Sequence, residues 1–141
     1  MIHFKPEEFQ GFYNKMDPEL LIKLDFLREI IGQPIQLSTA KGAIWRISDT
    51  DKSQHNLKAW GNVRAVDGYI PEGISYLEFF NYCKQAQFTG IGLYKGWAGG
   101  PGFHVDVRKD RDHNNPATWS SSYINGVNHY ASISKLIGED G

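Results

Sequence analysis

The sequence predicts an α+β fold, in which a small antiparallel sheet carries flanking helices, within a single domain over residues 1–141. Helical patterns and short strand patterns lie in separate stretches rather than alternating, as they would in a parallel βαβ sheet. Two strand patterns, at 90–94 and 103–108, are joined by a glycine-rich loop over 96–102, which favours a hairpin.

The first helix is the clearest local signal. Asp17 suits the N-cap, Pro18 the first helical position, and Glu19 the first turn. Apolar residues then recur at helical spacing, and Gly32 and Pro34 end the pattern. The recurring residues are Leu20, Leu24, Leu27 and Ile31. Residues 1–16 form an N-terminal extension whose aromatic side chains either pack on their own domain or dock on a neighbouring protein. These are Phe4, Phe9, Phe12 and Tyr13.

The middle of the chain alternates short strands and polar segments. Residues 35–38 predict a strand, 48–62 a polar loop around His55, and 64–67 a short strand that ends in Asp67. After a turn at 71–73, residues 74–87 predict a second helix with inward-facing Leu77, Phe80 and Cys83. Residues 117–119 are expected to place Trp119 in the core.

Composition excludes several function classes. The net charge is −1, and no basic stripe appears, so no nucleic-acid partner is expected. No apolar run has membrane-spanning length, and no basic leader with an apolar run opens the chain, so we expect synthesis in a cytoplasm and no membrane insertion. The single Cys83 excludes an internal disulfide and a multi-cysteine zinc site.

The segment over 103–108 alternates apolar and polar residues, so His104, Asp106 and Arg108 project from one face of a strand. With His55 and Asp67 upstream, the chain offers two nitrogens and one carboxylate oxygen, a ligand set found in mononuclear zinc sites. Spacing alone leaves the alternative open that His55 is a surface loop residue.

The order of the motifs resembles the M15 family of zinc D-Ala-D-Ala peptidases, and its small bacteriophage-encoded branch in particular. The resemblance extends from about residue 35 to residue 119. It is carried by Ser53-x-His55, Gly61, Ala65-x-Asp67, Gly92-x-Tyr94 and Phe103-His104-Val105-Asp106-Val107-Arg108.

The resemblance implies a Hedgehog/DD-peptidase-like fold, with Zn2+ bound by His55, Asp67 and His104. The substrate would be the stem peptides of peptidoglycan, cleaved by carboxypeptidase or endopeptidase action. Arg46 stands where the family has an arginine that contacts the substrate carbonyl and the transition state, a role that suits a guanidinium. Tyr94 is either a hydrogen-bond donor to substrate or a structural residue at a strand end.

Two departures from the family pattern bear on activity. His55 and Asp67 lie twelve positions apart (67 − 55), so the intervening loop must fold back for both to reach one ion. Pro101 occupies the position, three residues before His104, where many family members carry an acidic general base. Asp106 is the best substitute for that base, or else it orients a ligand from behind.

Two functions therefore compete. The first is a phage-encoded zinc peptidase that cleaves peptidoglycan peptides. The second is a virion structural or assembly protein that keeps the M15 fold without turnover. For both, we expect synthesis in the host cytoplasm and association with the virion, with other phage virion proteins as partners. Trp60 and Trp97, in polar or glycine-rich loops, either line a substrate groove or anchor their loops.

Overall fold

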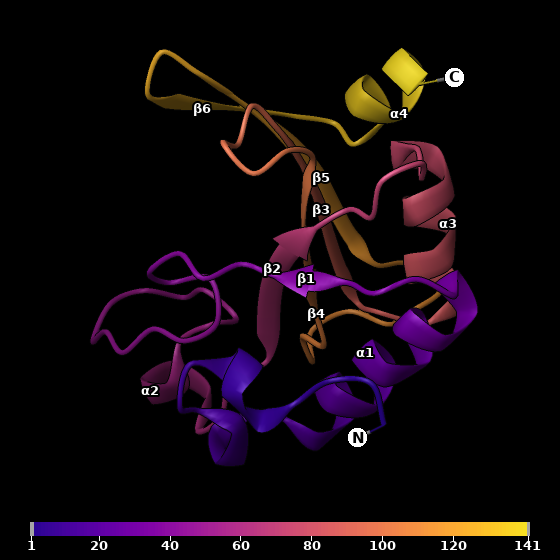
Figure 1. Ribbon diagram of the computed structural model, residues 1–141. Helices are drawn as coiled ribbons and strands as arrows, with labels where there is room; N and C mark the ends of the chain where they lie inside the picture. Colours follow the sequence, from indigo (N-terminus) through magenta and orange to yellow (C-terminus); the bar gives the residue numbers. More distant parts are fainter. Residues whose placement is uncertain (1, 141) are drawn as a thin grey trace.

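The computed structural model describes residues 2–140, which form an α+β fold around one mixed sheet (Figure 1). The strand order is β1-β2-β4-β3-β5-β6, and every neighbouring pair is antiparallel except β3 with β5. The fold class predicted from the sequence is thus confirmed. The strands are β1 (Gln36–Leu37), β2 (Ala65–Tyr69), β3 (Gly90–Lys95), β4 (Gly102–Asp106), β5 (Ala117–Ile124) and β6 (Val127–Ala131).

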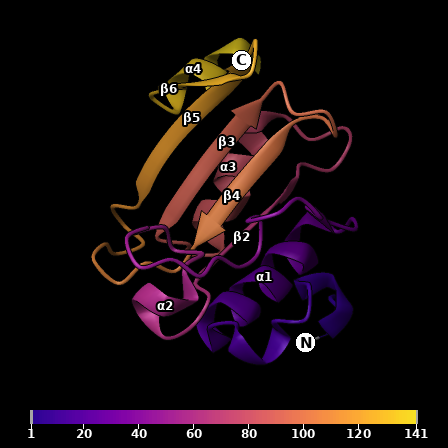
Figure 2. The ribbon, with the colours of Figure 1, turned by 90° about the vertical axis from the view of Figure 1, so that its left-hand side faces the viewer.

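Helices α1 (Pro18–Ile31) and α3 (Tyr76–Gln85) cover one face of the sheet, whereas the other, which we call the open face, has the short helix α2 (Leu57–Trp60) and its loop at one end (Figure 1). Figure 2 looks onto the open face, with α3 behind strands β3 and β4. The helical segments are η1 (Pro6–Phe9), η2 (Tyr13–Lys15), α1 (Pro18–Ile31), α2 (Leu57–Trp60), α3 (Tyr76–Gln85) and α4 (Ser134–Asp140). None of the helices within residues 2–140 has the length and apolar character needed to cross a membrane.

Helix α1 confirms its predicted ends and its buried side. The Asp17 carboxylate accepts a hydrogen bond from the Glu19 backbone N–H at 2.8 Å, and Gly32 ends the helix with a φ of 75°. The four apolar residues at helical spacing are all buried. The N-terminal aromatic residues pack on their own domain: Phe4 and Phe9 are buried, and Phe12 stacks on Trp45 with 4.4 Å between ring centroids.

Helix α3 faces the core with different residues from those expected. Its buried residues are Tyr76, Phe79 and Cys83, whereas Leu77 is 40% exposed and Phe80 is partly buried. The prediction for Leu77 was therefore wrong. The helix starts later than expected because Ser75 and Glu78 form a capping box, each side chain bonding to the other's backbone N–H.

Other elements went unpredicted. Helix α2 lies inside the expected polar loop, capped by Asn56, whose side chain accepts from the Lys58 N–H. Strand β6 and helix α4 follow β5, which continues well beyond residues 117–119. The core position expected for Trp119 was wrong, because its half-buried side chain lies beside His104 on the open face, with 5.0 Å between ring centroids.

Candidate metal centre

One cross-strand row on the open face carries the centre. Asp67 of β2 pairs with His104 of β4, His104 with Gly92 of β3, and Gly92 with Trp119 of β5. Directly paired residues point to the same side of a sheet, so the carboxylate and imidazole are neighbours by register alone. Gly92 leaves room for Trp119, because a Cβ there would come within 2.5 Å of the indole.

His55 reaches the same place from the loop before β2. The Arg46 backbone N–H donates to the His55 carbonyl at 2.9 Å, and the Leu57 N–H donates to the Arg46 carbonyl at 2.8 Å. The fully buried Asn56 amide fastens the loop, since its NH2 group donates to the Ser48 and Asp51 carbonyls. These bonds fold the loop back, as the twelve-residue separation requires.

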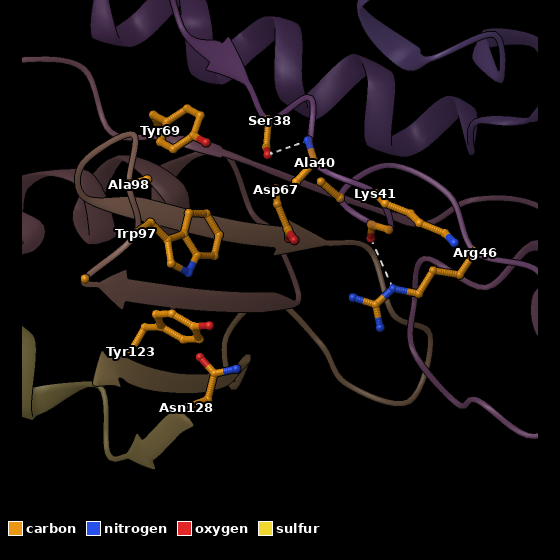
Figure 3. A pocket seen from close by; sticks show the side chains of 13 residues that line it. Ser38, Ala40, Lys41, Arg46, Asp67, Tyr69, Trp97, Ala98, Tyr123 and Asn128 are labelled. Carbon is orange, nitrogen blue, oxygen red and sulfur yellow. Dashed lines mark hydrogen bonds between the residues drawn. The ribbon is translucent and has the colours of Figure 1, made fainter. Parts of the chain in front are cut away.

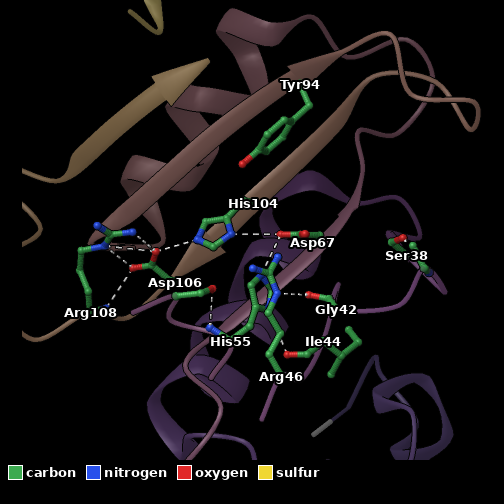
Figure 4. A network of polar contacts seen from close by, with 12 residues as sticks. Ser38, Gly42, Ile44, Arg46, His55, Asp67, Tyr94, His104, Asp106 and Arg108 are labelled. Atoms are coloured by element: carbon green, nitrogen blue, oxygen red, sulfur yellow. Dashed lines mark hydrogen bonds and ion pairs between the residues drawn. The ribbon is translucent and has the colours of Figure 1, made fainter. Parts of the chain in front are cut away.

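The structure brings His55, Asp67 and His104 together (Figure 4). One atom from each residue lies within 4.8 Å of the other two. Oδ1 of Asp67 is 3.2 Å from Nε2 of His55 and 3.0 Å from Nδ1 of His104. Ligand atoms around a tetrahedral zinc ion at bond lengths near 2.0–2.1 Å lie about 3.3 Å apart, so these separations fit one ion. The group can therefore hold a metal ion.

The other nitrogen of each imidazole determines what faces Asp67. Nδ1–H of His55 donates to the Ile44 carbonyl at 3.0 Å, and Nε2–H of His104 donates to Asp106 at 2.7 Å. In the neutral rings, the remaining nitrogens therefore direct lone pairs at the Asp67 carboxylate oxygen. Acceptors in such an arrangement repel one another unless a proton or a metal ion lies between them, so the donor set fits a bound cation.

Asp106 is buried behind His104, on the side of the ring away from Asp67. It is fully buried, and Arg108 donates to both of its oxygens at 2.6 to 3.2 Å. The guanidinium of Arg108 lies over the Trp119 ring at 5.3 Å. Gly90 makes the space for this pair, since a Cβ there would come within 2.2 Å of the Asp106 carboxylate. These contacts hold the His104 ring in one orientation.

The electrostatics of the metal-free centre follow from these contacts. Burial alone would lower the pKa of His104, but hydrogen bonds to Asp106 and Asp67 outweigh it and raise the pKa to about 9. Burial would raise the pKa of Asp67, yet the charge of His55 and the bond to His104 lower it to about 2. The pKa of Asp106 is also well below its usual range, because bonds from His104 and Arg108 exceed the cost of burial.

Two hollows meet at Asp67 and Arg46. The first, which we call the metal-site hollow, has a volume of about 280 Å³ and is lined by His55, Asp67 and His104 together with Tyr94, Trp119 and Arg46. The second, the aromatic hollow, has about 500 Å³ and extends from Asp67 and Arg46 toward Tyr69, Trp97 and Tyr123 (Figure 3). The centre is thus open to small molecules from one side.

The remaining candidates take defined positions around the centre. Arg46 lies at the rim between the hollows, where Nε donates to the Gly42 carbonyl at 3.1 Å. The Tyr94 hydroxyl accepts from Trp119 Nε1 at 2.8 Å, and burial together with the negative charge of Asp67 raises the pKa of Tyr94. Trp60 anchors its loop by donating to the Ser53 carbonyl at 2.8 Å, whereas Trp97 lines the aromatic hollow. The catalytic roles of Arg46, Tyr94 and Asp106 stay predictions.

Sequence reasoning missed the structural roles of four residues that build the centre. Asn56 had a readable signal, because an asparagine before a helical turn is a favoured N-cap. The spacing of Gly90 and Gly92 on one strand face also hinted at bulky neighbours opposite them. The Ile44 carbonyl had no signal, since any residue supplies a carbonyl and only the folded loop brings it to His55.

Comparisons with protein-family models, curated proteins and solved structures found no match to this chain. What stands is therefore the mixed α+β sheet fold with a His-Asp-His group at its open face.

Proposed function

We propose that this chain is a phage-encoded zinc peptidase that cleaves peptide bonds of bacterial peptidoglycan. The observation that carries the metal assignment is the convergence of two imidazole nitrogens on one oxygen of Asp67, with the opposite nitrogens held by Ile44 and Asp106. Two histidines and one carboxylate with an adjacent hollow match catalytic zinc sites that leave a position for water. The substrate class comes from the motif resemblance to M15 peptidases.

A bound zinc ion would supply a water of pKa about 7 and would polarise a substrate carbonyl. The chain's own residues orient the reactants. Arg46, at the junction of the hollows, is placed to bind a carbonyl oxygen as negative charge develops there. The Tyr94 hydroxyl accepts from Trp119, so its own proton is available to a substrate atom in the metal-site hollow.

The experiment that tests this function starts with the metal content of the purified protein, measured by mass spectrometry. Iron must be measured beside zinc, because iron oxygenases use the same two-histidine, one-carboxylate set. Purified peptidoglycan fragments are then digested with and without a chelator, followed by zinc addition. We expect about one zinc per chain and chelator-sensitive release of peptides. Iron in place of zinc, or cleavage that survives both the chelator and His104→Ala, would contradict the proposal.

Asp106 has two possible roles, as the general base or as the residue that orients His104, and one variant distinguishes them. If Asp106 is the general base, the Asp106→Asn variant would keep zinc and lose roughly two to four orders of magnitude in turnover. If Asp106 instead orients His104, the same variant would weaken zinc binding by about 10- to 100-fold. The burial of Asp106 and its bonds to His104 and Arg108 support the orienting role. Zinc titrations and turnover at saturating zinc distinguish the two.

A second candidate is a virion structural or assembly protein that binds metal without turnover. One observation favours it: among the described residues that line either hollow, Asp67 is the only carboxylate, so no free acidic base faces the substrate space. Stoichiometric zinc without cleavage of any peptidoglycan fragment would support this candidate. We propose virion association for both functions, with synthesis in the host cytoplasm, and mass spectrometry of purified particles tests that location.

A further inference from the structure

The aromatic hollow is a second candidate binding site, continuous with the metal centre. Asp67 and Arg46 line one end, and the loop after β3 and the β5–β6 hairpin line the other (Figure 3). Its volume of about 500 Å³ lies in the range of about 300–1,000 Å³ typical of small-molecule sites. The proposed chemistry at zinc uses only the end at Asp67, which leaves the aromatic end without an assigned role.

Trp97 is held in a fixed orientation within this hollow. Its ring stacks on Tyr94, with 4.7 Å between centroids and 19° between planes, and meets Tyr69 edge-on at 6.0 Å. Gly102 provides the room, since a Cβ there would lie 2.2 Å from the indole. The indole is still partly exposed to the hollow. A preorganised aromatic surface loses little conformational entropy when a ligand binds to it.

The opposite wall adds polar groups of defined orientation. Tyr123, 46% exposed, and Asn128 lie across from Trp97 on the β5–β6 hairpin. Ser121 donates to Oδ1 of Asn128 at 3.3 Å, so the NH2 group is the donor that Asn128 offers to a ligand. The charged lining residues are Lys41, Arg46 and the metal ligand Asp67. This balance favours a neutral or anionic ligand over a cationic one.

Aromatic faces combined with an amide and hydroxyl groups suit a pyranose ring. Such a ring has a C–H face that packs on an aromatic surface and a rim of hydroxyls that needs hydrogen-bond partners. An N-acetyl group adds a carbonyl that can accept from the Asn128 amide. A charged or purely apolar peptide side chain would use only part of this lining.

We propose that the aromatic hollow binds an N-acetylated amino-sugar ring of the glycan strand, stacked on Trp97 and facing Tyr123 and Asn128. The choice of this sugar rests on the proposed function, since peptidoglycan carries its peptides on such sugars. The protein then recognises the glycan beside the peptide, and not the peptide alone.

The test measures sugar binding separately from peptide cleavage. The probe is the β-1,4-linked trimer of N-acetylglucosamine, which carries no peptide, titrated into the zinc-loaded protein with NMR and tryptophan fluorescence as readouts. We expect saturable binding that weakens about tenfold or more in Trp97→Ala and Tyr123→Ala, the usual scale for an aromatic anchor. Trp97→Phe should recover part of the affinity. Phe26→Ala, an exposed aromatic residue on α1, is the matched control and should bind the sugar as the unmodified chain does.

The outcomes separate the two proposals. Absence of sugar binding to the folded, zinc-loaded protein overturns the sugar site, whatever the peptidase activity. Binding that persists in Tyr123→Ala and Trp97→Ala, both verified as folded, overturns its location. Tighter binding of a sugar-free stem peptide to the same residues overturns it in favour of a peptide site. Sugar binding without any cleavage supports the site and contradicts the proposed peptidase.

Discussion

The two faces of the sheet use alternate residues of the same strands for opposite purposes. On the face that the helices cover, Val66, Phe103 and Val105 are fully buried in the hydrophobic core. On the open face, their neighbours Asp67 and His104 carry charge in a half-enclosed hollow. A one-residue shift in register would exchange the two sets, so the same hydrophobic packing that stabilises the fold also fixes the candidate metal centre.

The two faces also differ in how they are stabilised. The covered face gains stability from burying apolar area. The open face must instead compensate buried charge, which it does by pairing Asp106 with Arg108 and His104. Removing one partner from such a network leaves the other charge buried and unpaired. Substitutions on the two faces should therefore affect different properties, stability on one and metal binding on the other.

The largest expected effect belongs to the open face. His104→Ala should abolish stoichiometric metal binding, because it removes one ligand and leaves Asp67 and Asp106 without their common partner. It should also remove the rise in melting temperature on adding zinc. Metal analysis and thermal melts measure both. His113→Ala, at an exposed loop histidine, is the control and should retain zinc. Full zinc occupancy in His104→Ala would disprove the ligand assignment.

The second effect belongs to the covered face. Phe79→Ala should lower the free energy of unfolding by about 3–5 kcal/mol, because Phe79 is fully buried on α3 and packs on Phe103 with 4.8 Å between ring centroids. Zinc affinity of the folded fraction should stay unchanged. Urea denaturation gives the first quantity and zinc titration the second. Leu77→Ala on the same helix should cost less than about 1 kcal/mol. A large loss of zinc affinity in Phe79→Ala would mean that the faces are not independent.

Gly90→Ala gives a smaller effect on the open face without altering any ligand. The new methyl group must displace the Asp106 carboxylate, so His104 loses its fixed orientation and zinc affinity falls by about 10- to 100-fold. Gly138→Ala is the control, because a Cβ there meets nothing within 4 Å. Competition with a zinc chelator measures the affinities. Equal affinity in both variants would show that the Asp106 contact does not position His104.

The smallest effect is a pH dependence of the metal-free protein. The pKa of His104 is raised to about 9, so its stabilising contribution is complete below about pH 6.5 and is lost as the pH rises to 9. Asp67, with a pKa of about 2, acts oppositely: its contribution is lost as the pH falls from about 4 to 2. Thermal melts in a chelator should show a fall of several degrees between pH 6.5 and 9, at roughly 3 °C per kcal/mol.

Asp106→Asn removes the carboxylate that bonds to Nε2 of His104 and should flatten that alkaline fall. A melting temperature that rises or stays constant from pH 6.5 to 9 in the unmodified chain would contradict the assigned charge on His104.

Local signals determined much of this protein. The Asp17 and Gly32 caps set both ends of α1, and alternation over 103–108 correctly placed His104 and Asp106 on one side of a strand. The metal-ligand candidates His55, Asp67 and His104 were also found from the sequence, and the structure brings them together. The caps and the alternation depend on neighbouring residues, whose spacing can be read directly, whereas the set of three ligands came from the order of the motifs.

The remaining features were decided by the tertiary structure, because they depend on contacts between segments that are distant in the sequence. The parallel pairing of β5 with β3 moved Trp119 from its expected core position to the side of His104. On α3, Phe79 rather than Leu77 is buried, and it packs on Phe103 of β4. The folded loop brought the Ile44 carbonyl to His55, and the β5–β6 hairpin closed the aromatic hollow opposite Trp97. No short window of sequence contains both partners of these contacts, so only the packed chain defines them.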